Sequence, residues 1–171
     1  MSKILILIVA VLACVGCSSM AVNSSKLKAQ YKKLIVRDIN WKETATSEIS
    51  GDQIEKFISS QPMLNELFRT EFDKNIKKIG IFEAITYGNA QADSATLTLV
   101  PKIYTLKPVG FMPGASFTGF LLSADGKLIG TYSEERRLNS TSSDPEKIKD
   151  NIEKLVRELA EDAASKLPYA L

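Results

Sequence analysis

The chain of 171 residues contains no histidine and only two cysteines, Cys14 and Cys17. Without an imidazole it lacks serine–histidine–aspartate and cysteine–histidine nucleophile systems, imidazole-bound zinc or iron, and the usual side chain that titrates near neutral pH. Both cysteines lie in the first 17 residues, so the remaining sequence has neither a thiol nor a disulfide. Carboxylates, lysine, tyrosine and serine remain, but no pattern pairs them. We predict a non-enzymatic protein with no cofactor and no metal site.

The chain also lacks an excess of one charge. Its 22 basic and 20 acidic residues give a net charge of +2, and Lys3 is the only charged residue before Cys17. Loss of Lys3 with the signal peptide predicted below lowers the net charge by one. Recognition of nucleic acid needs a basic patch or stripe, and a balanced, well-mixed charge distribution offers none. We therefore predict no nucleic-acid partner.

The apolar run at the start of the chain is too short to cross a membrane. It begins at Ile4 and ends before Ser18, about 14 residues, whereas a membrane-spanning helix needs about 20. A basic residue, Lys3, precedes the run, and the small residues 13–16 end it. This is the three-part pattern of a secretory signal. We predict that residues 1–16 are a removed signal peptide rather than a membrane helix.

The end of this signal resembles the lipobox of bacterial lipoproteins, in which small residues precede a cysteine that is acylated and becomes the new N-terminus. Cys17 follows Gly16 and precedes two serines, although Cys14 stands where the family prefers leucine. Cys14 follows an acceptable box at residues 11–13 but makes a very short signal. We favour Cys17, with Cys14 as the alternative. A third possibility is an ordinary cleaved signal in which both cysteines are incidental.

Lipidation would attach the protein to a membrane. One acyl chain binds a bilayer only marginally, but mature lipoproteins of this class carry three chains. Ser18 follows Cys17 in place of the aspartate that marks lipoproteins of enteric-type bacteria for retention in the inner membrane. Its absence favours the outer membrane facing the periplasm. We predict that residues 17–30 are the acylated cysteine and a tether. Residues 31–171, within the about 154 that remain after processing, are long enough for a single domain.

Segments rich in β-branched, aromatic and other apolar residues predict five strands, at residues 31–41, 81–87, 94–106, 115–123 and 127–138. Asp125-Gly126 separates the last two and predicts a tight hairpin turn, because this pair tolerates positive φ. Pro101 lies inside the third segment. Since proline cannot donate a hydrogen bond to a neighbouring strand, it predicts a sheet edge or a bulge there.

Two amphipathic helices are predicted from apolar residues at helical spacing. The first begins near Gln53 after a capping Asp52, is interrupted before Pro62 and ends at Gly80. The second runs from Asp144-Pro145 to the residue before Pro168. Its polar face mixes Glu and Lys, which favours packing on a sheet over the alternative of a helix lying on a membrane surface.

The order β-α-β-β-β-β-α predicts the α+β fold class. A mixed, mostly antiparallel sheet of about five strands would carry both helices on one face. The turn at residues 109–114 is unusual because it combines Gly and Pro with Val, Phe and Met. If exposed, Phe111 and Met112 are candidate contacts for a partner or a membrane. The alternative is that both side chains fold back over the sheet.

Four short motifs resemble an uncharacterised family of bacterial lipoproteins, domain of unknown function 4410. They are Leu34-Ile-Val-Arg-Asp-Ile, a helix ending Ile79-Gly-Ile-Phe, the stretch from Gly110 to Gly119, and Leu122-Ser-Ala-Asp-Gly-Lys-Leu-Ile-Gly. The order of elements is also similar to the periplasmic domain of the curli-secretion lipoprotein. The chain has no room for the added hairpins of a membrane pore, so this resemblance does not imply a secretion channel. Neither family implies catalytic residues.

Two functions follow as predictions. The first is a membrane-anchored cell-envelope lipoprotein whose domain is a non-enzymatic interaction or structural unit in the periplasm, with an envelope protein as partner. The alternative is a lipoprotein that carries a small ligand or a lipid in a pocket between helices and sheet. An enzyme ranks third, because carboxylates such as Asp38, Glu83 and Glu134 are present without a pattern that pairs them.

Overall fold

The computed structural model describes residues 29–139, 141–142, 144 and 147–170. The predicted signal peptide, both candidate acylation sites, Cys14 and Cys17, and most of the tether therefore lie outside the described residues. The start of the last helix predicted at Pro145 also lies outside them, and the described helix begins two residues later.

One mixed sheet forms the centre of the molecule, with the strand order β3-β1-β4-β6-β7. These strands are β1 Lys33–Val36, β3 Ala84–Tyr87, β4 Thr96–Lys107, β6 Gly114–Leu122 and β7 Leu128–Arg137. β1 runs parallel to both β3 and β4, whereas β4, β6 and β7 form two long antiparallel ladders. A two-residue strand, β2 Ala45–Thr46, pairs with the far end of β4, and β5 Gly110–Phe111 pairs with β8 Thr141–Ser142.

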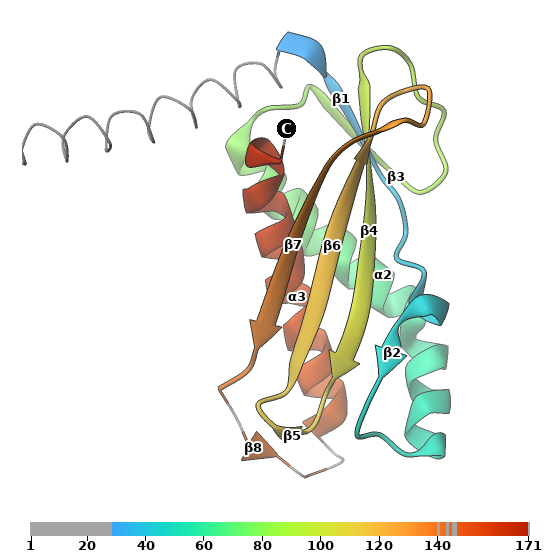
Figure 1. Ribbon diagram of the computed structural model, residues 1–171, viewed down its shortest axis with the longest axis vertical. Helices are drawn as coiled ribbons and strands as arrows, with labels where there is room; N and C mark the ends of the chain where they lie inside the picture. Colours follow the sequence, from blue (N-terminus) through green and yellow to red (C-terminus); the bar gives the residue numbers. More distant parts are fainter. Residues whose placement is uncertain (1–28, 140, 143, 145–146, 171) are drawn as a thin grey trace, which may run out of the picture.

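Helices α2 Gly51–Ile79 and α3 Lys147–Lys166 both pack on one face of this sheet (Figure 1). The α+β class, the mixed sheet and the order of the main elements are therefore confirmed. Among the described helices, none has both the length and the apolar character needed to cross a bilayer.

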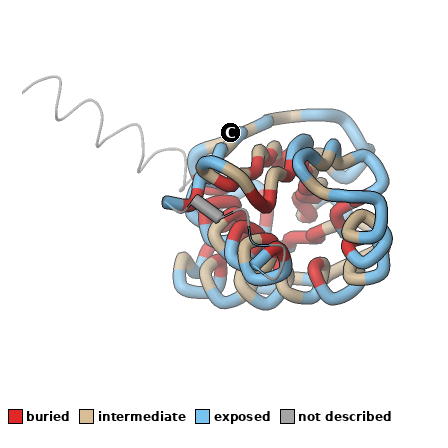
Figure 2. Tube along the Cα trace, turned by 90° about the horizontal axis from the view of Figure 1, so that it is seen from below, coloured by how far each residue is buried: buried red, intermediate tan, exposed pale blue. Residues whose placement is uncertain are grey.

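The core lies between the sheet and the two helices, where buried segments face one another in Figure 2. Along β6, residues alternate strictly between buried and half-buried, as expected of a strand with one covered face. Each helix contributes a stripe of buried apolar side chains, as the spacing of its apolar residues predicts. The buried side chains include Phe68, Phe72, Ile76, Leu97, Leu99, Phe117, Leu121, Leu155, Val156 and Leu159.

The predicted interruption of the first helix at Pro62 is wrong, because α2 continues through this residue. Proline has no N–H to bond the carbonyl four residues earlier, so it bends a helix without necessarily ending it. In the preceding turn, Ser59 Oγ and Ser60 Oγ each donate to a carbonyl three residues back. Figure 1 shows the first part of α2 running at an angle to the rest. The helix begins at a capping box on Ser50, not at Asp52.

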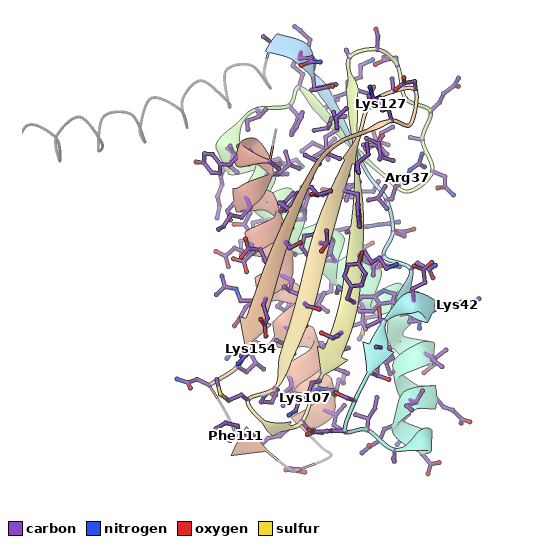
Figure 3. The ribbon with its side chains drawn as sticks, viewed as in Figure 1. Arg37, Lys42, Lys107, Phe111, Lys127 and Lys154 are labelled. Atoms are coloured by element: carbon purple, nitrogen blue, oxygen red, sulfur yellow. The ribbon has the colours of Figure 1, made fainter. Side chains whose placement is uncertain are left out.

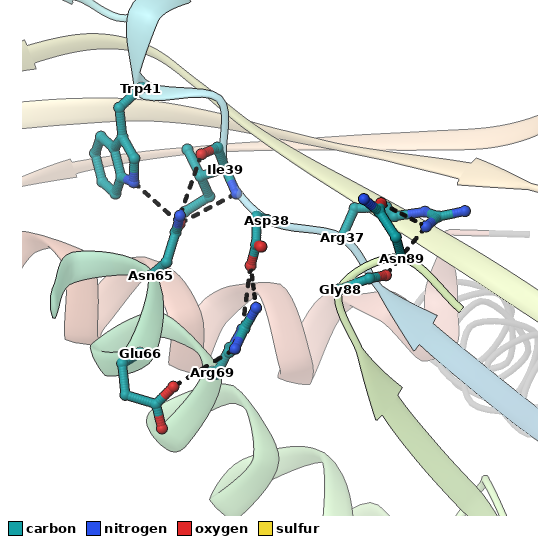
Figure 4. Close-up of polar contacts among 9 residues, drawn as sticks. All are labelled: Arg37, Asp38, Ile39, Trp41, Asn65, Glu66, Arg69, Gly88 and Asn89. Atoms are coloured by element: carbon teal, nitrogen blue, oxygen red, sulfur yellow. Dashed lines mark hydrogen bonds and ion pairs between the residues drawn. The ribbon is translucent and has the colours of Figure 1, made fainter. Parts of the chain in front are cut away.

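The first strand is shorter than predicted because the chain leaves the sheet after Val36. A side chain of α2 holds the departing segment: Asn65 Oδ1 accepts hydrogen bonds from the Ile39 N–H at 3.1 Å and from Trp41 Nε1 at 3.0 Å (Figure 4). Ile39 and Trp41 are both buried, and Trp41 lies in a short 3-10 turn, Trp41–Glu43.

Pro101 lies in a central strand, yet at a point where one side of that strand is locally free. β1 pairs with β4 only as far as Leu99, and β2 pairs with β4 only from Thr105. Pro101 has no N–H to donate on that side, but no strand lies beside it there to accept a hydrogen bond. The proline therefore costs the sheet no hydrogen bond. The ladder with β6 is irregular between Ile103 and Thr105. Pro101 was predicted to mark a sheet edge or a bulge. In the structure it lies where β4 has no neighbouring strand on one side, close to an irregularity in the ladder with β6.

The connector at residues 88–95 covers β1 on the face opposite the helices. Arg37 donates to Gly88 O at 3.1 Å and to Asn89 Oδ1 at 2.9 Å (Figure 4), and Lys33 Nζ lies 2.5 Å from Asp93 Oδ2. Because side chains two residues apart in a strand share a face, Ile35 lies between these two contacts. This placement explains why Ile35 is buried although it faces away from the helices.

Candidate functional site

Phe111 projects from the end of the sheet. This residue is 72% exposed, the highest value among the exposed large apolar residues that the structure describes. Figure 3 shows it at the lower end of the molecule, whereas both ends of the described chain lie at the upper end in Figure 1. The alternative in which Phe111 folds back over the sheet is therefore wrong for this residue. Met112 is half-buried.

Hydrogen bonds on both sides hold the backbone of this turn. Asn151 of α3 donates from Nδ2 to the Pro108 carbonyl at 2.7 Å. The N–H of Leu138 donates to the Pro113 carbonyl at 2.7 Å. Val109 and both prolines are buried. The turn is thus fixed by its apolar flanks and presents Phe111 to solvent.

The Glu48 carboxylate also lies close to the turn, beside Gly110. Gly110 has φ +88°, and a Cβ at this position would lie 1.9 Å from Glu48 Oε2. Glu48 forms an ion pair with Lys107 at 2.8 Å. Met112 and Glu48 themselves adopt positive φ, +55° and +62°, a conformation that persists in non-glycine residues only where the surroundings enforce it. Glycine is therefore favoured at 110 by the positive φ, and a larger residue there would require the flexible Glu48 side chain to move.

Two ion pairs lie on the segments that flank the turn. Lys107 pairs with Glu48, and Arg137 pairs with Glu135 at 2.7 Å. Gly114, at the start of β6, lies directly opposite Arg137 in the ladder. An aromatic side chain bordered by paired charges has the layout of an apolar interface centre with a polar rim.

The three carboxylates considered as catalytic groups are not brought together. They lie on different elements, and each forms an ion pair: Asp38 with Arg69 at 2.5 Å, Glu83 with Lys32 at 2.9 Å, and Glu134 with Lys166 at 3.2 Å. Among the described residues, no group of three or more His, Cys, Asp or Glu side chains has the arrangement of a metal site.

The sequence identified Phe111 and Met112 by composition but did not indicate what holds them. Glu48 and Asn151 lie far from the turn in sequence, and neither belongs to a motif. Gly110 is the one local signal, because a glycine between Val and Phe marks positive φ or a close approach.

Comparisons with known proteins support the fold. No family model matches the chain, and no curated protein matches it. The resemblance to domain of unknown function 4410 is therefore not confirmed. Among solved structures, a Xanthomonas campestris protein of the family domain of unknown function 330 superposes with a TM-score of 0.52 at 10% identity. The match covers 82% of this chain and 85% of that protein, and shows a shared fold.

Two further solved structures match more weakly. A minor lipoprotein from Acinetobacter baumannii has a TM-score of 0.43 at 10% identity, covering 81% of this chain and 94% of that protein. PelC from Paraburkholderia phytofirmans, solved as a dodecamer, has a TM-score of 0.41 at 12% identity. The match covers 77% of this chain and 85% of that protein.

Proposed function

We propose that the chain is a lipoprotein of the cell envelope whose folded domain binds another envelope protein and performs no catalysis. The observation that carries the proposal is the exposed Phe111 on a turn fixed from both sides. Aromatic side chains dominate the energetics of protein interfaces, and a fixed turn loses little conformational freedom on binding. The separation of Asp38, Glu83 and Glu134 into independent ion pairs supports a non-catalytic role.

The position of the turn supports a partner held away from the lipid anchor. The tether predicted at residues 17–30 would join the domain at the end where β1 begins, and Phe111 lies at the opposite end (Figures 1 and 3). A domain attached at one end presents the other to the periplasm. Outer-membrane attachment through Cys17, with Cys14 as the alternative, is part of this proposal.

The anchor is tested by membrane fractionation with intact-mass analysis of the wild type, Cys17→Ala and Cys14→Ala. We expect Cys17→Ala alone to release an unlipidated protein. Release by Cys14→Ala alone would move the acylation site to Cys14. If neither substitution frees the protein and the wild type carries no lipid mass, the anchored part of the proposal is wrong.

The partner contact is tested by replacing Phe111 and Met112 together with serine in the anchored protein. We expect loss of the chemically crosslinked complex in intact membranes, with an unchanged urea unfolding midpoint. Tyr169→Ser is the matched control, because this aromatic is 51% exposed and lies after α3. Equal crosslinking by the double variant and the control would contradict the proposed contact.

A further inference from the structure

An apolar groove of about 360 Å³ lies between the first turns of α2 and the first turns of α3. Phe57 and Leu64 of α2 and Ile148 and Ile152 of α3 form its apolar lining. All four are buried, whereas Met63 at the same groove is 44% exposed. The groove is separate from the turn that carries Phe111, which contributes no residue to its lining.

The bend of α2 accounts for the groove. Its α2 lining runs from Gln53 to Leu64, which places it on the turns before Pro62 and at the bend itself. Phe68, Phe72 and Ile76, farther along α2, are also buried but do not line the groove. Because Pro62 turns the first part of the helix away from the line of the rest, the two helices pack closely beyond the bend and leave space before it.

The dimensions fit one extended chain. The α2 lining spans eleven residue steps, about 16 Å along a helix axis. Ligand pockets typically hold about 300–1,000 Å³ and are mostly apolar with a few polar groups, and this groove lies at the small end of that range. An extended alkyl chain is much narrower than a helix, which is about 10–12 Å wide with its side chains.

The charges at the groove favour an anion. Lys56 and Lys149 lie on its two walls, with Glu153 as the acidic member. Glu153 Oε1 is 3.7 Å from Lys149 Nζ, whereas Lys56 forms no ion pair within the part of the chain that the structure describes. The groove therefore combines an apolar lining with one uncompensated ammonium group.

We propose that this groove binds a fatty acid, with the alkyl chain along Phe57, Leu64 and Ile152 and the carboxylate at Lys56. Each methylene buried contributes about 0.8 kcal/mol, and Lys56 supplies a charge-assisted contact to the carboxylate. This site does not depend on the partner contact at Phe111, so either proposal can fail alone.

Trp41 provides a built-in reporter. It is the only tryptophan of the chain, and its ring lies edge-to-face against Phe57 with ring centroids 5.7 Å apart. A ligand that displaces Phe57 changes the surroundings of Trp41. A fatty acid that packs against Phe57 and shifts its ring should therefore change Trp41 fluorescence without a label.

The experiment titrates the full chain, carrying Cys14→Ala and Cys17→Ala to exclude its own acyl chains, with dodecanoate below its micelle concentration. Calorimetry and Trp41 fluorescence report binding, and dodecanol serves as the uncharged probe. Ser60→Phe fills the groove at a lining position. Lys56→Glu reverses the charge at the groove, and Lys154→Glu makes the same change on an exposed part of α3 (Figure 3). A urea midpoint for every variant verifies folding.

We expect saturable 1:1 binding of dodecanoate that Ser60→Phe weakens at least about tenfold. Lys56→Glu should weaken dodecanoate about fivefold or more and leave dodecanol unchanged, because a single exposed ion pair has about this effect. Lys154→Glu should match the parent. The proposal is overturned if no saturable binding occurs, if folded Ser60→Phe binds as the parent does, or if Lys56→Glu and Lys154→Glu are equal. A doubled mass in solution that Ser60→Phe abolishes would instead assign the groove to a second copy.

Discussion

At the scale of single residues, Asn65 connects α2 to the segment that leaves the sheet. Its Oδ1 atom accepts from two buried donors, the Ile39 N–H and Trp41 Nε1. A buried donor without an acceptor costs about 1–3 kcal/mol. One amide of α2 therefore fixes a segment about 25 residues earlier in the chain, and the same segment carries the tryptophan that contacts Phe57.

Asn65→Ala should lower the free energy of unfolding by about 2–4 kcal/mol, because it leaves both donors unpaired. Urea unfolding followed by Trp41 fluorescence measures the loss. Asn75→Ala is the control, since Asn75 Nδ2 donates to a carbonyl of its own helix, Glu71 O. Equal losses in the two variants would contradict the role assigned to Asn65.

Asp93 contributes to the stability of the fold in a way that depends on pH. Hydrogen bonds from Lys33 and Thr96 lower the pKa of its carboxyl from the ordinary 3.8 to about 2. Because the folded pKa lies below the unfolded one, ionised Asp93 stabilises the fold above about pH 4. This contribution is lost as the pH falls toward about 2.

Asp93→Asn should therefore reduce stability at pH 7, and its difference from the wild type should shrink between about pH 4 and pH 2. Urea midpoints measured across this range provide the test. Glu161→Gln, which removes an exposed carboxylate of α3, should show no such convergence. A constant difference for Asp93→Asn at every pH would be inconsistent with a lowered pKa.

At the scale of elements, one glycine determines how β6, β7 and α3 fit together. Gly119 lies opposite Tyr132 in the ladder, and a Cβ on Gly119 would lie 2.5 Å from the Tyr132 ring. The Tyr132 hydroxyl donates to Ala163 O of α3 at 2.9 Å. The ring thus fills the space over the glycine and connects the sheet to the helix.

Gly119→Ala should destabilise the protein by about 1–3 kcal/mol through overpacking against Tyr132. Gly51→Ala is the matched control, because nothing lies within 4 Å of its added methyl group, and its effect should stay within about 0.5 kcal/mol. Thermal or urea unfolding of both variants measures the two changes in stability. A neutral Gly119→Ala would show that the ring moves freely.

The elements that the sequence predicted are those set by local patterns. The Asp125-Gly126 turn, the alternation along β6 and the stripe of α3 each depend on residues within a few positions of one another. Other features depend on contacts between distant segments. They are the parallel pairing of β1, the hydrogen bond from Trp41 to Asn65, and the continuation of α2 through Pro62. For Pro62, helical propensity predicts a break, but packing of the helix on both sides outweighs it.

At the scale of the whole molecule, the two candidate binding features are distinct. The Phe111 turn lies at the end opposite the start of β1, and the groove lies between the two helices. The composition of the turn made Phe111 a candidate, whereas no local pattern predicted the groove, because its walls come from helices almost one hundred residues apart. The predicted pocket lay between helices and sheet, whereas the observed groove lies between the helices.

The most direct test of the central claim is photocrosslinking in living cells with benzoylphenylalanine at position 111 of the otherwise native chain. We expect a discrete crosslinked band at 111 that disappears when the partner identified from it by mass spectrometry is deleted. The same group at position 169, an exposed aromatic after α3, should give no such band. Absence of a specific product at 111, or the same product at both positions, would contradict a partner contact at Phe111.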